Sequence, residues 1–321
     1  MRILFAGSPR IAVPALEALA RCSGKGFTLA GLLTRPDSPR GRSVRLEPTE
    51  CAAAAEPFSI PVFKPEKLDA QARSQVAALQ PDLLVSFAYG NIFGPQFLAL
   101  FPLGGLNIHP SLLPKYRGPT PIPAAIINQE TETGITIQKL AEEMDSGDIV
   151  LQQTVPLSGK ETTASLGETM AGIAAPLLLL AIEGYIAGTL RMQPQDHAAA
   201  TYCSLISKED GLINWNRSAQ EIEAQIRAFD PWPLSWTMHK GLELFILKAK
   251  VLETNGGTSG EPRSETSAPG EVLGKDRDKG ILIQTGEGIL AVGMLQYRAK
   301  KLLEWQAFVN GARDFFGTRL G

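Results

Sequence analysis

Features that would place this chain in a membrane, in an oxidising compartment or among strongly basic proteins are scarce in its sequence. Three cysteines occur in 321 residues, far apart at Cys22, Cys51 and Cys203. Because no two of them have metal-ligand spacing, we expect buried or incidental thiols in a reducing compartment and no metal site. The formal net charge of −2 excludes binding of nucleic acid through overall positive charge, but not through a local basic loop.

Long apolar segments are also lacking. The N-terminus has no charged region followed by a long apolar stretch, so we expect no signal peptide. The most apolar run, Pro176–Ile182, is too short to cross a bilayer and is interrupted by Glu183, which favours a buried helix face. We therefore expect a cytoplasmic protein that does not associate with a membrane.

The length and composition are those of an ordinary soluble protein. A chain of 321 residues exceeds the common single-domain size, so we expect two domains. The 44% of hydrophobic and 20% of charged residues are typical of a globular fold that buries a large core without disulfides or metals.

Apolar runs alternate with helix-like stretches over the first half of the sequence. The runs predict strands at Arg2–Ala6, Phe27–Leu33, Leu83–Phe87 and Gly105–His109, and stretches such as 9–20 and 70–79 predict helices between them. This alternation indicates an α/β fold with a mostly parallel sheet, whose sites lie at the carboxyl ends of the strands.

Later segments have the character of antiparallel structure. Segments 134–140 and 149–155 predict a hairpin with Gly147 in the connecting turn. After residue 200, short strands with glycine turns at 242–249, 281–284 and 288–292 predict a small β-barrel. The stretch 254–270 is rich in Gly, Ser, Thr and Pro, and we interpret it as a mobile loop within this second domain.

Candidate catalytic side chains concentrate between Asn107 and Asp148. Because strand side chains repeat every two residues, Asn107 and His109 are expected to face the same side near the end of their strand. The loop 142–148 is expected to bring carboxylates to the same edge of the sheet. Asn can donate to a developing oxyanion, His can move a proton near neutral pH, and an Asp beside the His can orient it and stabilise its charged form.

Each of these residues taken alone has a more ordinary interpretation. A lone His in a strand is more often structural than catalytic, a lone Asn at a strand end is usually a turn former, and 145–148 is compatible with a solvated turn. No Ser or Cys stands out as an activated nucleophile, and no glycine-rich nucleotide loop is present. The set therefore suits acyl transfer by direct attack of an amine without a covalent enzyme intermediate, and the residues alone leave the function open.

Four segments carry a resemblance to a known family. They are 88–90 (AYG), 107–118 (NIHPSLLPKYRG), 132–150 (ETGITIQKLAEEMDSGDIV) and 226–236 (IRAFDPWPLSW). Through them the chain, from its first residue to its last, resembles the methionyl-tRNA formyltransferases of the folate-dependent formyltransferase superfamily. The Asn-x-His…SLLP…Asp-x-Gly-Asp pattern is shared by the superfamily, and the AFDPWP motif narrows the resemblance to the enzymes that act on tRNA and their near relatives.

The resemblance implies an architecture and a reaction. It implies a Rossmann-type formyltransferase domain at residues 1–190, a linker at 191–206, and an OB-like β-barrel at 207–321 that helps to hold tRNA. The formyl group would pass from 10-formyltetrahydrofolate to the α-amino group of methionyl initiator tRNA, for translation initiation. Asn107, His109 and Asp145 match the family's catalytic trio: Asn107 with His109 would stabilise the oxyanion, His109 would relay a proton towards folate N10, and Asp145 would hold His109 and keep it charged.

The resemblance also implies two sets of binding residues. Folate is expected along a turn, the SLLP segment and one loop residue, with the pterin recognised by backbone groups. These residues are Phe87, Ala88, Tyr89, Gly90, Ser111, Leu112, Leu113, Pro114 and Met144. The loop 34–48, otherwise interpretable as a solvated basic loop, is expected to contact the acceptor end of tRNA through Arg35, Arg40, Arg42 and Arg45, with Arg42 the best match. Such binding weakens as salt rises, and a monomer is expected.

Other functions stay open at this point. Another folate-dependent formyltransferase, acting on a nucleotide-sugar amine, or a formyl-folate hydrolase module would keep the trio and not need the arginine loop. A non-catalytic folate- or RNA-binding protein on the same scaffold is expected to have a broken trio, and here the trio is intact. A nicotinamide dehydrogenase is suggested only by the βαβ opening, and the missing glycine fingerprint disfavours it.

Overall fold

The computed structural model describes residues 1–39, 45–252, 267–312 and 314–321, and the contacts within it divide the chain into two compact units. Unit 1 consists of Met1–Pro121, Glu132–Pro156 and Leu166–Ser204. Unit 2 consists of Ile122–Thr131, Leu157–Ser165 and Leu205–Gly321. Residues 191–204, which were predicted as most of a linker, lie in unit 1.

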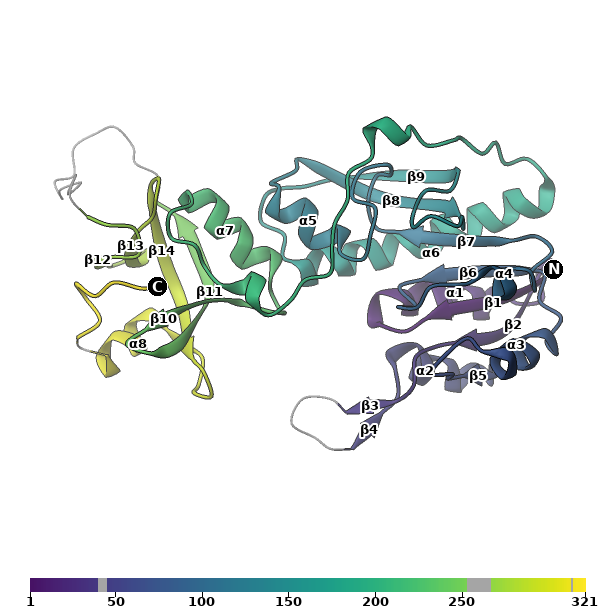
Figure 1. Cartoon of the computed structure of the whole chain (residues 1–321), viewed down its shortest axis with the longest axis horizontal. Helices are drawn as coiled ribbons and strands as arrows, with labels where there is room; N and C mark the ends of the chain where they lie inside the picture. The colour runs from purple at the N-terminus through teal and green to yellow at the C-terminus, as the bar shows by residue number, and fades with distance from the viewer. Residues whose placement is uncertain (40–44, 253–266, 313) are drawn as a thin grey trace. The chain divides into compact units, whose positions relative to one another are not determined.

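Unit 1 is built on a seven-stranded sheet in the order β5-β2-β1-β6-β7-β8-β9 (Figure 1). The strands are β1 (Arg2–Gly7), β2 (Thr28–Leu33), β5 (Val62–Phe63), β6 (Leu83–Phe87), β7 (Gly105–His109), β8 (Glu132–Lys139) and β9 (Ile149–Pro156). The first five are mutually parallel, whereas β8 runs antiparallel to β7 and β9 antiparallel to β8. The predicted α/β fold with a mostly parallel sheet is confirmed, and β6 and β7 have the predicted bounds.

Short helices follow the parallel strands. They are α1 (Val13–Cys22), α2 (Glu50–Ala55), α3 (Ala70–Ala77), α4 (Pro95–Leu98) and α5 (Pro121–Ile127). Helices α2 and α3 have side-chain N-caps. The Thr49 side chain accepts from the Ala52 N–H at the start of α2, and the Asp69 side chain accepts from the Ala72 N–H at the start of α3. Every residue of β6 is buried, as expected for a parallel strand covered on both faces.

The centre of the sheet contains the position where such folds bind ligands. The strand order reverses at β1 and β6, with β2 and β5 on one side and β7 on the other. In open α/β sheets the crevice at the carboxyl ends of the strands at this point is the usual binding position. Here Ser8, after β1, donates its hydroxyl to the carbonyl of Tyr89, after β6, at 3.1 Å. The turn at 87–90 therefore lies at the switch point of the sheet.

Strands β8 and β9 form the predicted hairpin, with Gly147 in the segment that joins them. The loop after β8 starts beside the amino end of β7, because the Leu140 N–H donates to the Gly105 carbonyl at 2.8 Å. This starting position follows from the antiparallel direction of β8 relative to β7. The loop nevertheless folds back, so that Asp145 reaches side chains of β7.

The apolar run at 176–182 is part of a much longer helix than expected, α6 (Thr163–Ala187). By length and composition alone it is one helix that could cross a membrane, so the prediction that the run is too short is corrected. Its buried residues recur at helical spacing: Leu166, Met170, Ala171, Ala174, Leu177, Leu178, Ala181 and Ile182. Near its end Tyr185 donates to the Leu103 carbonyl at 2.7 Å, so the helix packs as a core element, and the predicted buried face is confirmed.

Unit 2 contains an antiparallel sheet in the order β10-β11-β14-β13-β12, with β15 paired to β14. Its elements are α7 (Ala219–Ala228), β10 (Ser235–His239), β11 (Leu242–Val251), β12 (Val272–Asp276), β13 (Gly280–Gln284), β14 (Ile289–Tyr297), β15 (Leu303–Glu304) and α8 (Trp305–Gly311). Helix α7 begins with a capping box between Ser218 and Glu221. The predicted antiparallel β domain is confirmed, and most of the predicted mobile loop, residues 253–266, lies outside the described residues.

The two remaining strands of unit 1 flank the arginine loop. Strands β3 (Ser38–Pro39) and β4 (Leu46–Glu47) pair antiparallel and form a ribbon that projects from the sheet in Figure 1. Residues 40–44 between them lie outside the described residues.

Candidate active site

The side chains of Asn107, His109 and Asp145 meet on one face of β7. Asn107 Nδ2 donates to Asp145 Oδ1 at 3.2 Å, and His109 Nδ1 lies 3.5 Å from Asp145 Oδ2. The strand period therefore places Asn107 and His109 on a common side, as predicted. The His109 and Asp145 side chains are only 5% and 11% exposed, and charges interact more strongly where water is largely excluded.

The Asp145 carboxylate is held by further donors. Gln138 Nε2, on β8, donates to Oδ1 at 2.8 Å, and the Gly118 backbone N–H donates to Oδ2 at 2.8 Å. Gln138 pairs with Asn107 across the two strands, so both amides approach the carboxylate from the sheet. These donors fix the orientation of the carboxylate with respect to the His109 ring.

The His109 ring has a defined tautomer. Its Nε2 lies 2.8 Å from the Tyr116 carbonyl oxygen. Because a carbonyl oxygen only accepts, Nε2 carries a hydrogen, and the neutral ring has its lone pair on Nδ1, towards Asp145. His109 is thus arranged to take up a proton at Nδ1, where the Asp145 carboxylate would stabilise the resulting charge.

Burial sets the resting charge of this histidine. It lowers the pKa of His109 below the usual 6.5, against the Asp145 charge and the Tyr116 hydrogen bond, which both raise it. The ring is therefore neutral at pH 7 before substrate binds. Burial and the Asp145 charge thus act on the ring in opposite directions, and the role of Asp145 in keeping His109 charged stays a prediction.

Backbone geometry around Asp145 leaves no space for larger residues. A Cβ at Gly118, where φ is +119°, would lie 2.1 Å from the Cys203 carbonyl oxygen. A Cβ at Gly147 would lie 1.9 Å from the Lys139 carbonyl oxygen. Asp145 has a φ of +55°, a left-handed conformation that Asp tolerates better than most residues. The close approach of these backbones aims the carboxylate at Asn107 and His109.

A second group of polar residues at this site was missed from the sequence. Gln195 Nε2 donates to the backbone carbonyls of Asp145 at 2.9 Å and Gly147 at 2.7 Å. Arg117, only 2% exposed, donates through Nε and Nη2 to Gln195 Oε1 at 3.1 and 2.7 Å. Arg117 Nη2 also lies 3.1 Å from His197 Nδ1. Arg117 lies in the NIHPSLLPKYRG segment, but nothing local in the sequence marks Gln195.

The residues predicted to bind folate differ in what they can offer. The side chains of Phe87, Tyr89 and Leu113 are buried in the fold, so only their backbone groups are available. Ser111 is also buried, and its hydroxyl donates to the Lys115 carbonyl at 2.6 Å. These four positions build the turns and do not present side chains to a ligand.

The other predicted folate positions are more open. Ala88 and Gly90 are exposed and have φ values of +50° and +88°, so the turn after β6 is accessible at these two positions. Met144 is 55% exposed beside Asp145. Backbone recognition with one flexible apolar side chain is therefore compatible with the geometry.

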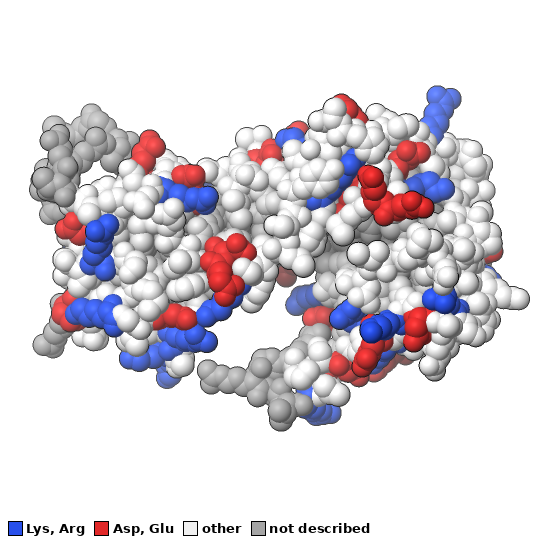
Figure 2. Space-filling view, in the orientation of Figure 1, with Lys and Arg blue, Asp and Glu red and all other residues white. Residues whose placement is uncertain are grey.

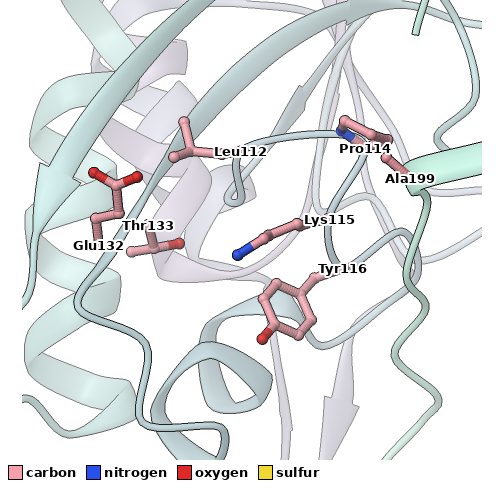
Figure 3. Close-up of a pocket in the computed structure, with 7 residues that line it drawn as sticks. All are labelled: Leu112, Pro114, Lys115, Tyr116, Glu132, Thr133 and Ala199. Atoms are coloured by element: carbon pink, nitrogen blue, oxygen red, sulfur yellow. The ribbon is translucent and has the colours of Figure 1, made fainter. Parts of the chain in front are cut away.

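A cavity of about 310 Å³ lies beside the SLLP segment. It is lined by Leu112, Pro114, Lys115, Tyr116, Glu132, Thr133 and Ala199 (Figure 3). Two of these, Leu112 and Pro114, were predicted to bind folate, whereas the trio is absent from the lining that the described residues form. The catalytic trio and this cavity are thus separate features. Tyr116 connects them, because it lines the cavity and its carbonyl contacts His109.

The arginines predicted to contact tRNA are only partly described. Arg40 and Arg42 lie outside the described residues. Arg35 donates through Nη1 to Asn91 Oδ1, next to the 87–90 turn, and its backbone N–H donates to Ser8 Oγ at 3.2 Å. Arg45 is exposed and directly precedes β4. Arg35 therefore lies beside the predicted folate turn.

Thiol chemistry has no support at this site. Burial raises the pKa of Cys51 to about 12, and burial also raises the pKa of Cys203, the cysteine next to Tyr116 and Arg117. A thiol with a raised pKa forms little of the reactive thiolate at neutral pH. Among the described residues, no cluster of three His, Cys, Asp or Glu side chains could hold a metal ion.

Comparison with known families agrees with this fold and site. Residues 1–182 match the family described as formyl transferase, and residues 205–313 match the formyl transferase C-terminal domain. Together the two matches span most of the chain. The fold and the site define a formyl transferase, and the chain belongs to that family.

Full-length relatives point to one branch of it. The chain is 46% identical to methionyl-tRNA formyltransferase of Treponema denticola, over 98% of each chain. Its fold is also similar to that of WlaRD, a sugar 3N-formyl transferase, with a TM-score of 0.65 and 18% identity over 94% of this chain and 99% of that one. HypX from Aquifex aeolicus, solved with tetrahydrofolic acid, has a TM-score of 0.61 and 20% identity over 98% of this chain and 48% of HypX. Within the family, the chain groups by sequence with the methionyl-tRNA formyltransferases.

Proposed function

We propose that this chain transfers the formyl group of 10-formyltetrahydrofolate to the α-amino group of methionyl initiator tRNA. The convergence of Asn107, His109 and Asp145 is the observation that carries the proposal. The 46% identity to the Treponema denticola enzyme over 98% of each chain supports methionyl-tRNA as the acceptor.

The geometry suggests what each side chain does. The neutral amine attacks the formyl carbon, a C–N bond forms, and negative charge develops on the formyl oxygen. An Asn amide nitrogen has two hydrogens; Asp145 accepts one from Asn107, and the other can donate to this oxyanion. When the bond from the formyl carbon to folate N10 breaks, that nitrogen needs a proton.

His109 is suited to carry that proton. Its Nδ1 lone pair can accept the proton that the amine loses and return it to the departing nitrogen. Asp145 stabilises the transient imidazolium, since its Oδ2 lies 3.5 Å from Nδ1. An α-amino group has a reference pKa of about 7.7–8.0, so a neutral histidine is a sufficient base at pH 7.

Folate binding is proposed at the 87–90 turn, the SLLP segment and Met144. The position of the turn at the switch point of the sheet and the exposure of Ala88 and Gly90 support this site. Arg35, bonded to Asn91 beside the same turn, places a positive charge there. That charge would favour the carboxylates of a folate.

tRNA binding is proposed to depend on the arginine loop. On the face shown in Figure 2, lysine and arginine side chains are interspersed with acidic ones, with no continuous basic surface over the described residues of that face. The net charge of −2 likewise gives no general attraction to RNA. The loop 34–48, whose sequence contains four arginines, is then the feature that we propose contacts phosphates. We also propose a monomeric, cytoplasmic enzyme, as suits a soluble tRNA substrate.

The decisive experiment is a formyl-transfer assay with a panel of acceptors. Initiator methionyl-tRNA would be offered beside elongator methionyl-tRNA, glycinamide ribonucleotide and an amino-sugar nucleotide, over a range of salt concentrations. We expect salt-sensitive transfer to initiator methionyl-tRNA and at most trace transfer to the others. Transfer to a small amine alone would retain the trio's role and overturn the acceptor, and release of formate without transfer would identify a hydrolase.

A further inference from the structure

The segment 193–204, between α6 and unit 2, runs alongside the catalytic loop. Arg117 N–H donates to the Thr201 carbonyl at 2.9 Å, and Cys203 N–H donates to the Arg117 carbonyl at 2.8 Å. The Tyr116 N–H donates to the Thr201 hydroxyl at 2.9 Å. These bonds join the segment to Tyr116, which contacts His109, and to Arg117, which directly precedes the Gly118 N–H that bonds Asp145.

We infer that Gln195 is a positioning residue for Asp145, and that the buried Arg117 sets the orientation of its amide. This inference rests on the proposed function, because it assigns a role in the same transfer reaction. Gln195 is 5% exposed and contacts the backbone of the Asp145 turn without approaching the trio's side chains.

The orientation of the Gln195 amide follows from its partners. Arg117 can only donate, so the amide atom that faces its Nε and Nη2 is the oxygen. The NH₂ group is thereby directed at the Asp145 and Gly147 carbonyls, which can only accept. Among the described residues, the partners of the Arg117 guanidinium are the neutral side chains of Gln195 and His197. A permanently charged group thus keeps a neutral amide in one of its two possible orientations.

The Asp145 turn needs such support. Its φ of +55° is a conformation that residues with side chains seldom adopt, and it persists only where the surroundings determine it. Gln195 bonds the carbonyls of the two residues that flank Ser146. Gln138 donates to the Asp145 carboxylate, and its Oε1 lies 3.3 Å from Gln195 Nε2. Losing the Gln195 donor would free the turn and move the carboxylate relative to His109 Nδ1.

Gln195→Glu isolates this role. The new carboxylate has nearly the same shape and still accepts from Arg117, so the buried guanidinium keeps a partner. Arg117 keeps that carboxylate ionised, so it cannot donate to the Asp145 and Gly147 carbonyls and instead repels them. We expect the variant to fold, to keep the KM for the formyl donor within about twofold, and to lose about 10- to 100-fold in kcat, as is usual for residues that orient a catalytic group.

Gln225→Glu is the matched control. Gln225 is also 5% exposed, and its Nε2 lies 3.3–3.5 Å from the carbonyls of residues 210–212 in unit 2. The same change of a buried amide to a carboxylate is therefore made away from the trio. We expect its kcat to stay within about twofold of the unmodified protein, even where its stability falls.

A double variant separates positioning from general weakening of the fold. If Gln195 acts through Asp145, then Gln195→Glu should cause no further loss of kcat in a protein that already carries Asp145→Ala. A full additional loss in that background, a kcat of Gln195→Glu equal to the unmodified protein, or an equal loss in Gln225→Glu would each overturn the inference. Absence of transfer by the unmodified protein would instead overturn the proposed function, so the two failures are distinguishable.

Discussion

The Tyr116 carbonyl and the His109 ring are joined at 2.8 Å through Nε2, and this contact decides which ring nitrogen can react. Because Nε2 already donates, the free lone pair is on Nδ1, on the side of Asp145. The catalytic loop thus fixes the tautomer of the histidine with a backbone atom, which no substitution of the Tyr116 side chain removes.

Removal of any member of the trio should abolish most turnover. For His109→Ala we expect a loss of about 10²- to 10⁴-fold in kcat, since a proton relay is removed. For Asn107→Ala we expect about 10²- to 10³-fold, the usual effect of removing one oxyanion donor. Asp145→Ala should also lose most turnover. Circular dichroism checks that each variant folds, and single-turnover formyl transfer measures its activity. Near-normal turnover of folded His109→Ala would contradict the mechanism.

The charge of His109 can be followed directly, since the chain has only three histidines. We expect its ring to titrate below pH 6.5, because burial lowers its pKa. Replacing Asp145 with Asn should move that pKa lower still, since the Asp145 charge raises it. Histidine NMR over pH 4–8 with His109→Gln as the assignment control measures this. A His109 pKa above 6.5 would show that the Asp145 charge outweighs burial.

The same shift has a consequence for stability. A folded-state pKa below the unfolded value means that the unfolded chain binds more protons between the two values. The contribution of His109 to stability is therefore fully present above pH 6.5 and is lost as the pH falls from 6.5 through the folded pKa. Urea unfolding of His109→Gln should be less pH-dependent in this window than unfolding of the unmodified protein.

Gly118 should be intolerant of any side chain. In Gly118→Ala the new Cβ would meet the Cys203 carbonyl at 2.1 Å at a φ of +119°, which displaces the N–H that bonds Asp145. We expect about 1–3 kcal/mol of destabilisation, typical of overpacking, together with a fall in kcat. Gly167→Ala in α6 is the control: its Cβ would meet nothing within 4 Å, so it should be neutral or stabilise by up to about 1 kcal/mol. Equal effects of the two changes would refute this account.

Helix α6 should behave as a core element and not as a membrane span. Leu178 is fully buried and Leu180 is 58% exposed, two residues apart on the same helix. We expect Leu178→Ala to cost about 2–5 kcal/mol. Leu180→Ala should stay within about 0.5 kcal/mol, as for most exposed positions. Urea denaturation measures both, and equal costs would argue against a buried face.

The arginine loop should govern use of tRNA and not the chemistry. We expect Arg42→Ala to raise the KM for initiator tRNA, to leave the KM for the formyl donor unchanged, and to reduce the salt slope of log KM by about one. Arg21→Ala, which removes an exposed arginine paired with Glu17 on α1, should have no such effect. An unchanged tRNA KM in Arg42→Ala would remove that residue from the proposed interface.

Local patterns were sufficient for every strand of the first sheet except β5, and for the pairing of Asn107 with His109 in the site. The apolar run 105–109 has the bounds of β7 because a buried strand shows in sequence without knowledge of its neighbours. The period of two then placed Asn107 beside His109. For α6 the same reasoning stopped too early, because Glu183 was taken as an interruption. The helix continues through this residue, whose side chain is exposed.

The rest of the site depends on contacts that a linear pattern does not contain. Gln195 reaches the Asp145 turn across 50 positions of the chain, and Gly118 matters through a backbone 85 residues away, at Cys203. The resting charge of His109 was also beyond the sequence, because it depends on how completely the ring is buried.

The bonds between Arg117 and Thr201–Cys203 decide where this chain can be divided. A protein cut after residue 182, where the first family match ends, or after residue 190, where the linker was predicted to begin, would retain Asn107, His109 and Asp145. It would nevertheless lose the amide of Gln195. It would also lose the residues that bond the backbone of Tyr116 and Arg117, which are Thr201 and Cys203. Cys203 is the earliest terminus that preserves these contacts, so a catalytic half that ends before Cys203 should keep more of its affinity for folate than of its kcat.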